Sequence, residues 1–153
     1  MEEETSYDLD LKEWKLIGDL HHKMFWLRQK ELSHYSITAR QLLILRVIES
    51  LGSKATISTI AKALDRKIDV ISRQTSTLEK DGFINRTKDK PRSRLLTFKL
   101  NEKSLELLKI AKHSKGMSEV LSVLTWEERQ QLDVVLNRLS VKLNEYTSNQ
   151  IKD

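Results

Sequence analysis

The chain has 153 residues, 39% of them hydrophobic and 32% charged. This length is enough for one domain with a hydrophobic core, or for one small domain plus an oligomerisation element. It contains no cysteine, which excludes disulfides and cysteine-based redox sensing. No apolar run approaches the ~20 residues that cross a bilayer, and the acidic start lacks the pattern of a secretory signal, so we expect a cytoplasmic protein with no membrane partner. The net charge of +5 is modest, but acidic residues gather at the N terminus, which leaves the remainder more basic.

A long N-terminal helix is the first predicted element. Leu11, Trp14, Ile17 and Met24 recur at helical spacing and give it a wide apolar face. A second helix is predicted to begin after Thr38, because Thr38 and Gln41 have the spacing of a capping box.

Two short helices follow and form a helix-turn-helix pattern. Thr56 is a suitable N-cap for the first, whose apolar stripe runs to Leu64. After a polar break, a second helix of about residues 68–81 buries only one narrow side, and Gly82 ends it as a C′ glycine. Its other side carries small polar groups and one guanidinium, which suits entry into a major groove: Asp69, Ser72, Arg73 and Ser76.

A β-hairpin with a basic tip is predicted next. Phe83 and Ile84 open one strand, and Leu96, Phe98 and Leu100 alternate along the returning strand. Cations in the tip are suited to phosphates or to a narrow minor groove; they are Arg86, Lys88, Lys90, Arg92 and Arg94.

The C-terminal part is predicted to be helical. One helix leaves the hairpin near Leu105, and Lys115–Gly116 marks a bend or break. Thr125 and Glu128 form a capping box for the last helix. The wide apolar faces of both terminal regions have little of their own chain to cover them, so packing against a second copy would bury them.

The central segment resembles the MarR-type (multiple antibiotic resistance regulator) winged-helix transcription factors. Residues 37–41 are similar to the family's Leu-Thr-x-x-Gln motif, residues 78–84 to its Leu-Glu-x-x-Gly-hydrophobic-hydrophobic motif, and Arg94 with residues 98–103 to its wing arginine and exit. The family usually has an aspartate two residues before the wing arginine, where this chain has Arg92. Without that partner, Arg94 is expected to lie on a more mobile and more cationic wing.

The resemblance implies a fold class and an organisation. The fold is mainly α with a small β-hairpin wing: a winged helix-turn-helix with N- and C-terminal dimerisation helices. Residues 1–35 would form the acidic segment and first dimerisation helix, residues 36–101 the DNA-binding lobe, and residues 102–153 the C-terminal dimerisation helices. A two-fold dimer places its recognition helices ~34 Å apart, so the DNA partner is expected to be a palindromic operator.

The candidate DNA contacts divide into two groups. The recognition helix is predicted to read bases with Arg73, Ser72 and Ser76, together with Asp69, although Asp69 also stabilises the N-terminal end of a helix whatever the DNA does. Phosphates or the minor groove are assigned to Lys67, Lys88, Lys90, Arg92 and Arg94. The alternative for each of these cations is an ordinary solvated surface.

A ligand crevice is a further implication of the resemblance, because family members often bind a small aromatic effector between the dimer helices and the DNA-binding lobe. The residues expected to face it are His21, Met24, Phe25, Arg40 and Leu43. Core or dimer packing is the simpler interpretation of these side chains. The four histidines are isolated or adjacent on one helix, so no metal site and no cofactor are expected.

Three functions remain open at this point. The first is a sequence-specific transcriptional regulator, most simply a repressor. The second is a sequence-indifferent architectural DNA-binding protein, which the additional cation at Arg92 would favour. The third is a winged-helix module that binds proteins. An enzyme is not expected, because no phosphate-binding glycine loop or catalytic triad motif is present.

Overall fold

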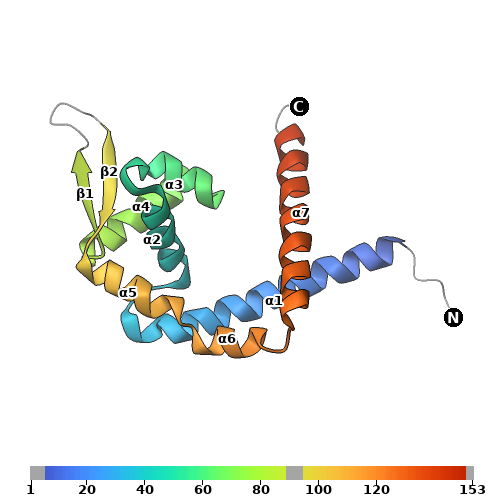
Figure 1. Ribbon diagram of the computed structural model, residues 1–153. Coiled ribbons are helices and arrows are strands. Elements are labelled where there is room, and N and C mark those ends of the chain that lie inside the picture. The colour runs from blue at the N-terminus through green and yellow to red at the C-terminus, as the bar shows by residue number, and fades with distance from the viewer. Residues whose placement is uncertain (1–5, 89–94, 151–153) are drawn as a thin grey trace. The chain divides into compact units, whose positions relative to one another are not determined.

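The computed structural model describes residues 6–88 and 95–150. These residues form helices and one two-stranded antiparallel sheet, as the sequence predicts (Figure 1). The chain divides into two compact units, residues 1–117 and 118–153. In chain order the elements are α1 (Ser6–Leu32), the 3-10 helix η1 (Ser33–Tyr35), α2 (Ala39–Leu51), the 3-10 helix η2 (Gly52–Lys54), α3 (Ile57–Leu64), α4 (Ile68–Lys80), β1 (Ile84–Lys88), β2 (Leu96–Leu100), α5 (Glu102–Lys112), α6 (Lys115–Leu121) and α7 (Trp126–Gln150).

Helix α2 forms the centre of the first unit. It packs against α1, α3, α4, α5 and β2, so side chains on several of its sides are covered. Leu42, Ile44, Leu45 and Ile48 are all buried. Each such side chain contributes about 1.5 to 3 kcal/mol of hydrophobic stabilisation. Packing against α2 therefore stabilises the helix-turn-helix.

The helix-turn-helix is confirmed. α3 buries Ile60 and Ala61, and α4 buries Ile71, Thr75 and Leu78. The hydroxyl of Thr75 donates to the carbonyl of Ile71 at 2.9 Å, so its burial leaves no unsatisfied polar group. The opposite side of α4 is left for solvent.

The predicted helix ends are also confirmed. Thr38 and Gln41 form the predicted reciprocal capping box. Asn101 and Ser104 form another one at the start of α5. Gly82 has a φ of +73°. The N–H of Phe83 donates to the carbonyl of Leu78 at 2.8 Å and that of Gly82 to Glu79 at 3.1 Å. This is the Schellman pattern, which directs the chain from α4 into β1.

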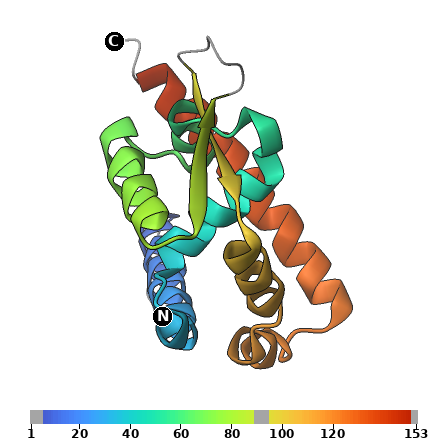
Figure 2. The same cartoon turned by 90° about the vertical axis from the view of Figure 1, so that its left-hand side faces the viewer.

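The hairpin pairs β1 with β2 so that Arg86 lies opposite Phe98 and Thr87 opposite Thr97 (Figure 2). The predicted alternation of β2 is wrong at two positions, because Leu96 is exposed and Thr97 is buried as well as Phe98. Its hydroxyl lies 3.1 Å from that of Thr87, and the N–H of Phe98 donates to the carbonyl of Ala55 at 2.8 Å. The centre of the strand, at Thr97 and Phe98, is therefore covered on both faces, whereas Leu96 and Lys99 are exposed.

The C-terminal part differs in two details from the prediction: the break lies at other residues, and a short helix, α6, lies between the two expected helices. α5 ends at Lys112 and α6 begins at Lys115, so the break lies at residues 113–114 and Lys115–Gly116 open the next helix. Thr125 and Glu128 do form a capping box at the start of α7. Within residues 6–88 and 95–150, no helix combines the length and the hydropathy needed to cross a membrane.

Candidate nucleic-acid interface and an adjacent cavity

One face of α4 is polar and exposed. Asp69, Arg73 and Ser76 lie on it, and Ser72 is half-buried at its edge. Figure 2 shows α4 at the border of the lobe, beside the hairpin. Thr77 also lies on this face, at four residues from Arg73, and its hydroxyl donates to the Arg73 carbonyl at 3.1 Å. Sequence reasoning missed Thr77, although its i+4 spacing from Arg73 was a usable signal.

Two of these side chains are paired. Nη2 of Arg73 lies 3.3 Å from Oδ2 of Asp69, one helical turn away. Both side chains remain largely exposed, at 76% and 69%. The long guanidinium is therefore held over the polar face by a contact that leaves most of its N–H groups free for a partner.

Cations flank the N-terminal end of this face. Lys67 is the N-cap residue of α4 and is exposed, as are Lys62 on α3 and Arg66 in the turn. The turn itself depends on Asp65, whose φ of +50° reverses the chain after α3. A helix N terminus with exposed cations beside it provides both N–H groups and positive charge for a phosphate.

The wing carries a further exposed cation within the described residues. Lys88 is exposed at the end of β1. Three of the cations predicted to contact DNA, Lys90, Arg92 and Arg94, lie outside the described residues.

Arg86 is different from the other wing cations. Its Nη2 lies 3.1 Å from Oε2 of Glu79 on α4. Its guanidinium lies over the Phe98 ring, with Cζ 5.4 Å from the ring centroid. Its side chain is only 30% exposed. Arg86 therefore joins the wing to α4 and does not extend into solvent.

The C-terminal end of α4 is also fixed to α5. The side-chain amide of Asn101 donates to the Gly82 carbonyl at 2.7 Å, and the ammonium of Lys103 donates to the Asp81 carbonyl at 2.8 Å. The same ammonium lies 3.9 Å from the centroid of the Phe83 ring. These bonds set the orientation of α4 relative to both the wing and α5.

A cavity of about 490 Å³ lies beside α4. Four of the five residues predicted to face a ligand crevice line it, namely His21, Phe25, Arg40 and Leu43, whereas Met24 does not. The guanidinium of Arg40 lies over the Phe25 ring at 5.8 Å. The remaining lining residues come from α1 to α4 and the turn before α4: His22, Ile44, Leu64, Arg66, Val70, Ile71 and Gln74.

Two histidines of α1 lie at the cavity. His21 and His22 are adjacent in the helix, and both line the cavity. The cavity is wide enough to span the ~100° between adjacent helical positions. Among the residues that the structure describes, no three His, Asp or Glu side chains come together as metal ligands.

A polar junction links α1 to the segment between α5 and α6. Glu31 accepts hydrogen bonds from the Ser114 hydroxyl at 2.5 Å and the Gly116 N–H at 2.8 Å, and it pairs with Arg28 at 3.0 Å. Arg28 also donates to the carbonyl of Ala111. Burial acts to raise the pKa of Glu31, but these hydrogen bonds and the nearby arginine outweigh it, so the pKa of this carboxyl is lowered.

The structure defines a winged helix-turn-helix protein. It has a short helix, a second helix with a polar exposed face, and a two-stranded wing that is fixed to the second helix. Residues 37–91 match the model of the MarR family. The chain therefore carries a MarR-family domain. No curated protein sequence matches it.

Solved structures of MarR-type regulators have the same fold. A cysteine-to-serine mutant of MarR from E. coli with operator DNA is 21% identical, with 88% of this chain and 98% of that one covered and a TM-score of 0.76. MepR from S. aureus in a DNA complex is 23% identical, with 84% and 96% covered and a TM-score of 0.74. An organohalide-sensing regulator bound to 2,4-dichlorophenol is 24% identical, with 88% and 83% covered and a TM-score of 0.75.

Proposed function

We propose that this protein is a homodimeric, sequence-specific DNA-binding transcriptional regulator that acts as a repressor. The observation that carries the proposal is the exposed polar face of α4 with Arg73 at its centre and cations at its N-terminal end. In this proposal α4 enters the major groove, and the wing contacts phosphates or the minor groove. The protein binds DNA and does not catalyse a reaction.

Two of the similar structures contain DNA, which supports this choice of partner. Base edges would be read by Arg73, Ser72 and Ser76, and Thr77 extends the same face. Lys67 and Lys88 would hold phosphates beside it. A repressor of this kind would occupy a palindromic operator, with one half-site for each protomer.

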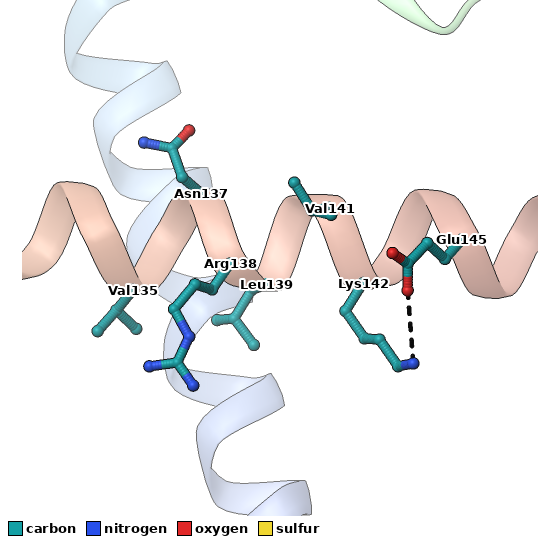
Figure 3. Close-up of a pocket in the computed structure, with 7 residues that line it drawn as sticks. All are labelled: Val135, Asn137, Arg138, Leu139, Val141, Lys142 and Glu145. Atoms are coloured by element: carbon teal, nitrogen blue, oxygen red, sulfur yellow. Dashed lines mark hydrogen bonds and ion pairs between the residues drawn. The ribbon is translucent and has the colours of Figure 1, made fainter.

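The dimer is proposed from exposed apolar faces on the terminal helices. Along α7, Leu132, Leu136, Leu139 and Leu143 share one helical face and are all at least 39% exposed. Figure 3 shows Val135 and Leu139 projecting from the same side of α7. α1 likewise exposes Trp14, at 73%. A second copy would remove these side chains from water, which is the main driving force for association.

An effector site is proposed at the cavity beside α4. Its apolar walls suit an aromatic ring, and Arg40, Arg66 and the two histidines suit one acidic substituent. Val70 and Gln74 belong to the recognition helix, so a ligand there would contact α4 directly. If the ligand binds better to a position of α4 that does not fit the operator, DNA affinity falls by the difference in its affinity for the two states, typically ~1 to 3 kcal/mol.

The first test is fluorescence anisotropy with the DNA upstream of the protein's own gene and a scrambled duplex of equal length, at several salt concentrations. A regulator is expected to favour its own duplex by at least ~10³. Equal, salt-dependent binding to both would indicate the architectural protein, and no DNA binding would indicate a protein-interaction module. Expression from the bound promoter in a strain without the protein distinguishes a repressor, which gives a rise, from an activator.

The effector proposal has its own test. 2,4-dichlorophenol, the ligand in one similar structure, is titrated into the protein–DNA complex and release of DNA is measured. An R40A variant should bind DNA normally but respond less to the ligand, whereas R46A, on the same helix but outside the cavity, should respond as wild type does. Equal responses from both variants would place the ligand elsewhere.

A further inference from the structure

The contact between Asp69 and Arg73 leads to an inference about how the operator is chosen. α4 contains two acidic residues, and Glu79 is paired with Arg86 at the wing. Asp69 is therefore the acidic group on the polar face itself. A carboxylate at this position would face DNA phosphates and would be repelled by them.

The position of the Asp69 carboxylate beside Arg73 gives this carboxylate a role in base recognition. Oδ2 of Asp69 lies 3.3 Å from one terminal nitrogen of Arg73. Because a guanidinium has five N–H donors, the second terminal nitrogen and the remaining donors stay available. Guanine presents two acceptors, O6 and N7, side by side in the major groove, and a bidentate arginine matches both.

We propose that Asp69 is the selectivity residue of the recognition helix: it holds Arg73 for a guanine and makes binding to any other sequence less favourable. This inference rests on the proposed function and specifies what the site recognises, a G·C base pair within each half-site. Without Asp69, the flexible arginine can turn to the nearest phosphate and contribute to binding at every sequence alike. With Asp69, the carboxylate offsets part of the positive charge of Arg73, so the attraction between this arginine and a phosphate is weaker.

Selectivity then comes partly from repulsion, a common way to separate a correct partner from an incorrect one. In a complex with non-cognate DNA, the Asp69 carboxylate is repelled by the phosphates and no hydrogen bonds to guanine offset this repulsion. In a complex with the cognate site, Arg73 gains hydrogen bonds to the two guanine acceptors. The two effects of removing Asp69 have opposite signs: affinity for a scrambled duplex rises, while the preference for guanine falls. A residue that only stabilised the helix would produce neither change.

The test compares the wild type with D69N and D69A. A library of randomised duplexes identifies the preferred half-site, and anisotropy then measures affinity for that site, for the same site with the G·C pair replaced by A·T, and for a scrambled duplex. D81N is the matched control, because Asp81 is an exposed carboxylate just beyond the same helix. Circular dichroism and thermal unfolding verify that each variant is folded.

For D69N and D69A, we expect scrambled-duplex affinity to rise by about 3- to 10-fold and the guanine preference to fall by at least about fivefold. D81N should keep the guanine preference, and D69A should have no further effect on that preference in an R73A background. Unchanged guanine preference in D69N and D69A would overturn the inference, as would a wild-type half-site without guanine. Both of these results leave the regulator intact, whereas a wild type that prefers no sequence contradicts the proposed function itself.

Discussion

Arg86 of β1 and Glu79 of α4 form an ion pair of 3.1 Å that joins the wing to the recognition helix. The pair is half-buried, and the arginine also lies over the Phe98 ring on the second strand. Arg86 therefore bridges three elements, although in the sequence it is one of several cations in a basic segment. Its charge is used within the protein.

This assignment predicts different results for two neighbouring wing cations. R86A should destabilise the fold by about 1 to 2 kcal/mol, because it removes an ion pair and a cation–π contact. It should leave the salt dependence of DNA binding unchanged. K88A should leave stability unchanged and reduce the slope of log K against log salt by about one per protomer. Urea unfolding and anisotropy measure the two effects, and a reduced salt slope in R86A would show that Arg86 does contact phosphate.

A second prediction concerns the turn that leads from the recognition helix into the wing. Gly82 has a φ of +73°, which is unfavourable for residues with a Cβ atom. G82A should therefore lower the free energy of unfolding by about 1 to 2 kcal/mol, although no atom of the described residues beyond its chain neighbours lies within 4 Å of the added Cβ.

The control for this prediction is D81A. Asp81 is exposed and has an ordinary φ of −80°. Urea unfolding should give D81A within about 0.5 kcal/mol of the wild type. Equal destabilisation by both variants would indicate that lost contacts, and not backbone conformation, explain the effect of G82A.

The stability of the fold at acidic pH should depend on Glu31. Because its pKa is lowered in the folded state, the ionised carboxylate stabilises the fold above the ordinary value of 4.5, and this stabilisation is lost as the pH falls through the folded pKa. The stability advantage of the wild type over E31Q should therefore be constant near neutral pH and should shrink below about pH 4.5.

The experiment is urea unfolding of both proteins from pH 7 to pH 3. E49Q is the comparison, because Glu49 has an arginine partner three residues away at 3.1 Å but, within the described part of the chain, no serine hydroxyl that donates to it. The pH dependence that is specific to E31Q then reports the Ser114 and Gly116 hydrogen bonds. A constant difference down to pH 3 would exclude this role for Glu31.

The parts of the fold that sequence predicts well are those with local causes. The caps at Thr38, Asn101 and Thr125 each involve groups three residues apart, so their spacing is visible in the sequence. The burial of Thr97 and the pairing of Arg86 could not be predicted, because they depend on contacts between separate elements. A basic segment indicates charge but does not show which arginine is used within the protein.

The candidate site follows the same division. The polar face of α4 is a property of one helix, and its spacing identified Arg73 and Asp69 correctly as neighbours on one side. The cavity is assembled from several helices. The resemblance to a family indicated four of its eleven lining residues, and the seven that were missed include His22 and Arg66. That these residues bind DNA or a ligand remains a prediction.

The proposed dimer makes the last prediction. L139E places a charge on the leucine face of α7, and in a two-fold dimer each substitution occurs twice, so two carboxylates would be buried without partners. The dimer dissociation constant should rise at least about 100-fold, which corresponds to roughly 3 kcal/mol.

V141E is the matched control, because Figure 3 shows Val141 on the side of α7 opposite to Leu139. Sedimentation equilibrium should find L139E monomeric at concentrations where V141E and the wild type are dimers. L139E should also lose its preference for a two-half-site operator over a single half-site. If L139E remains a dimer, the leucine face of α7 is not the interface.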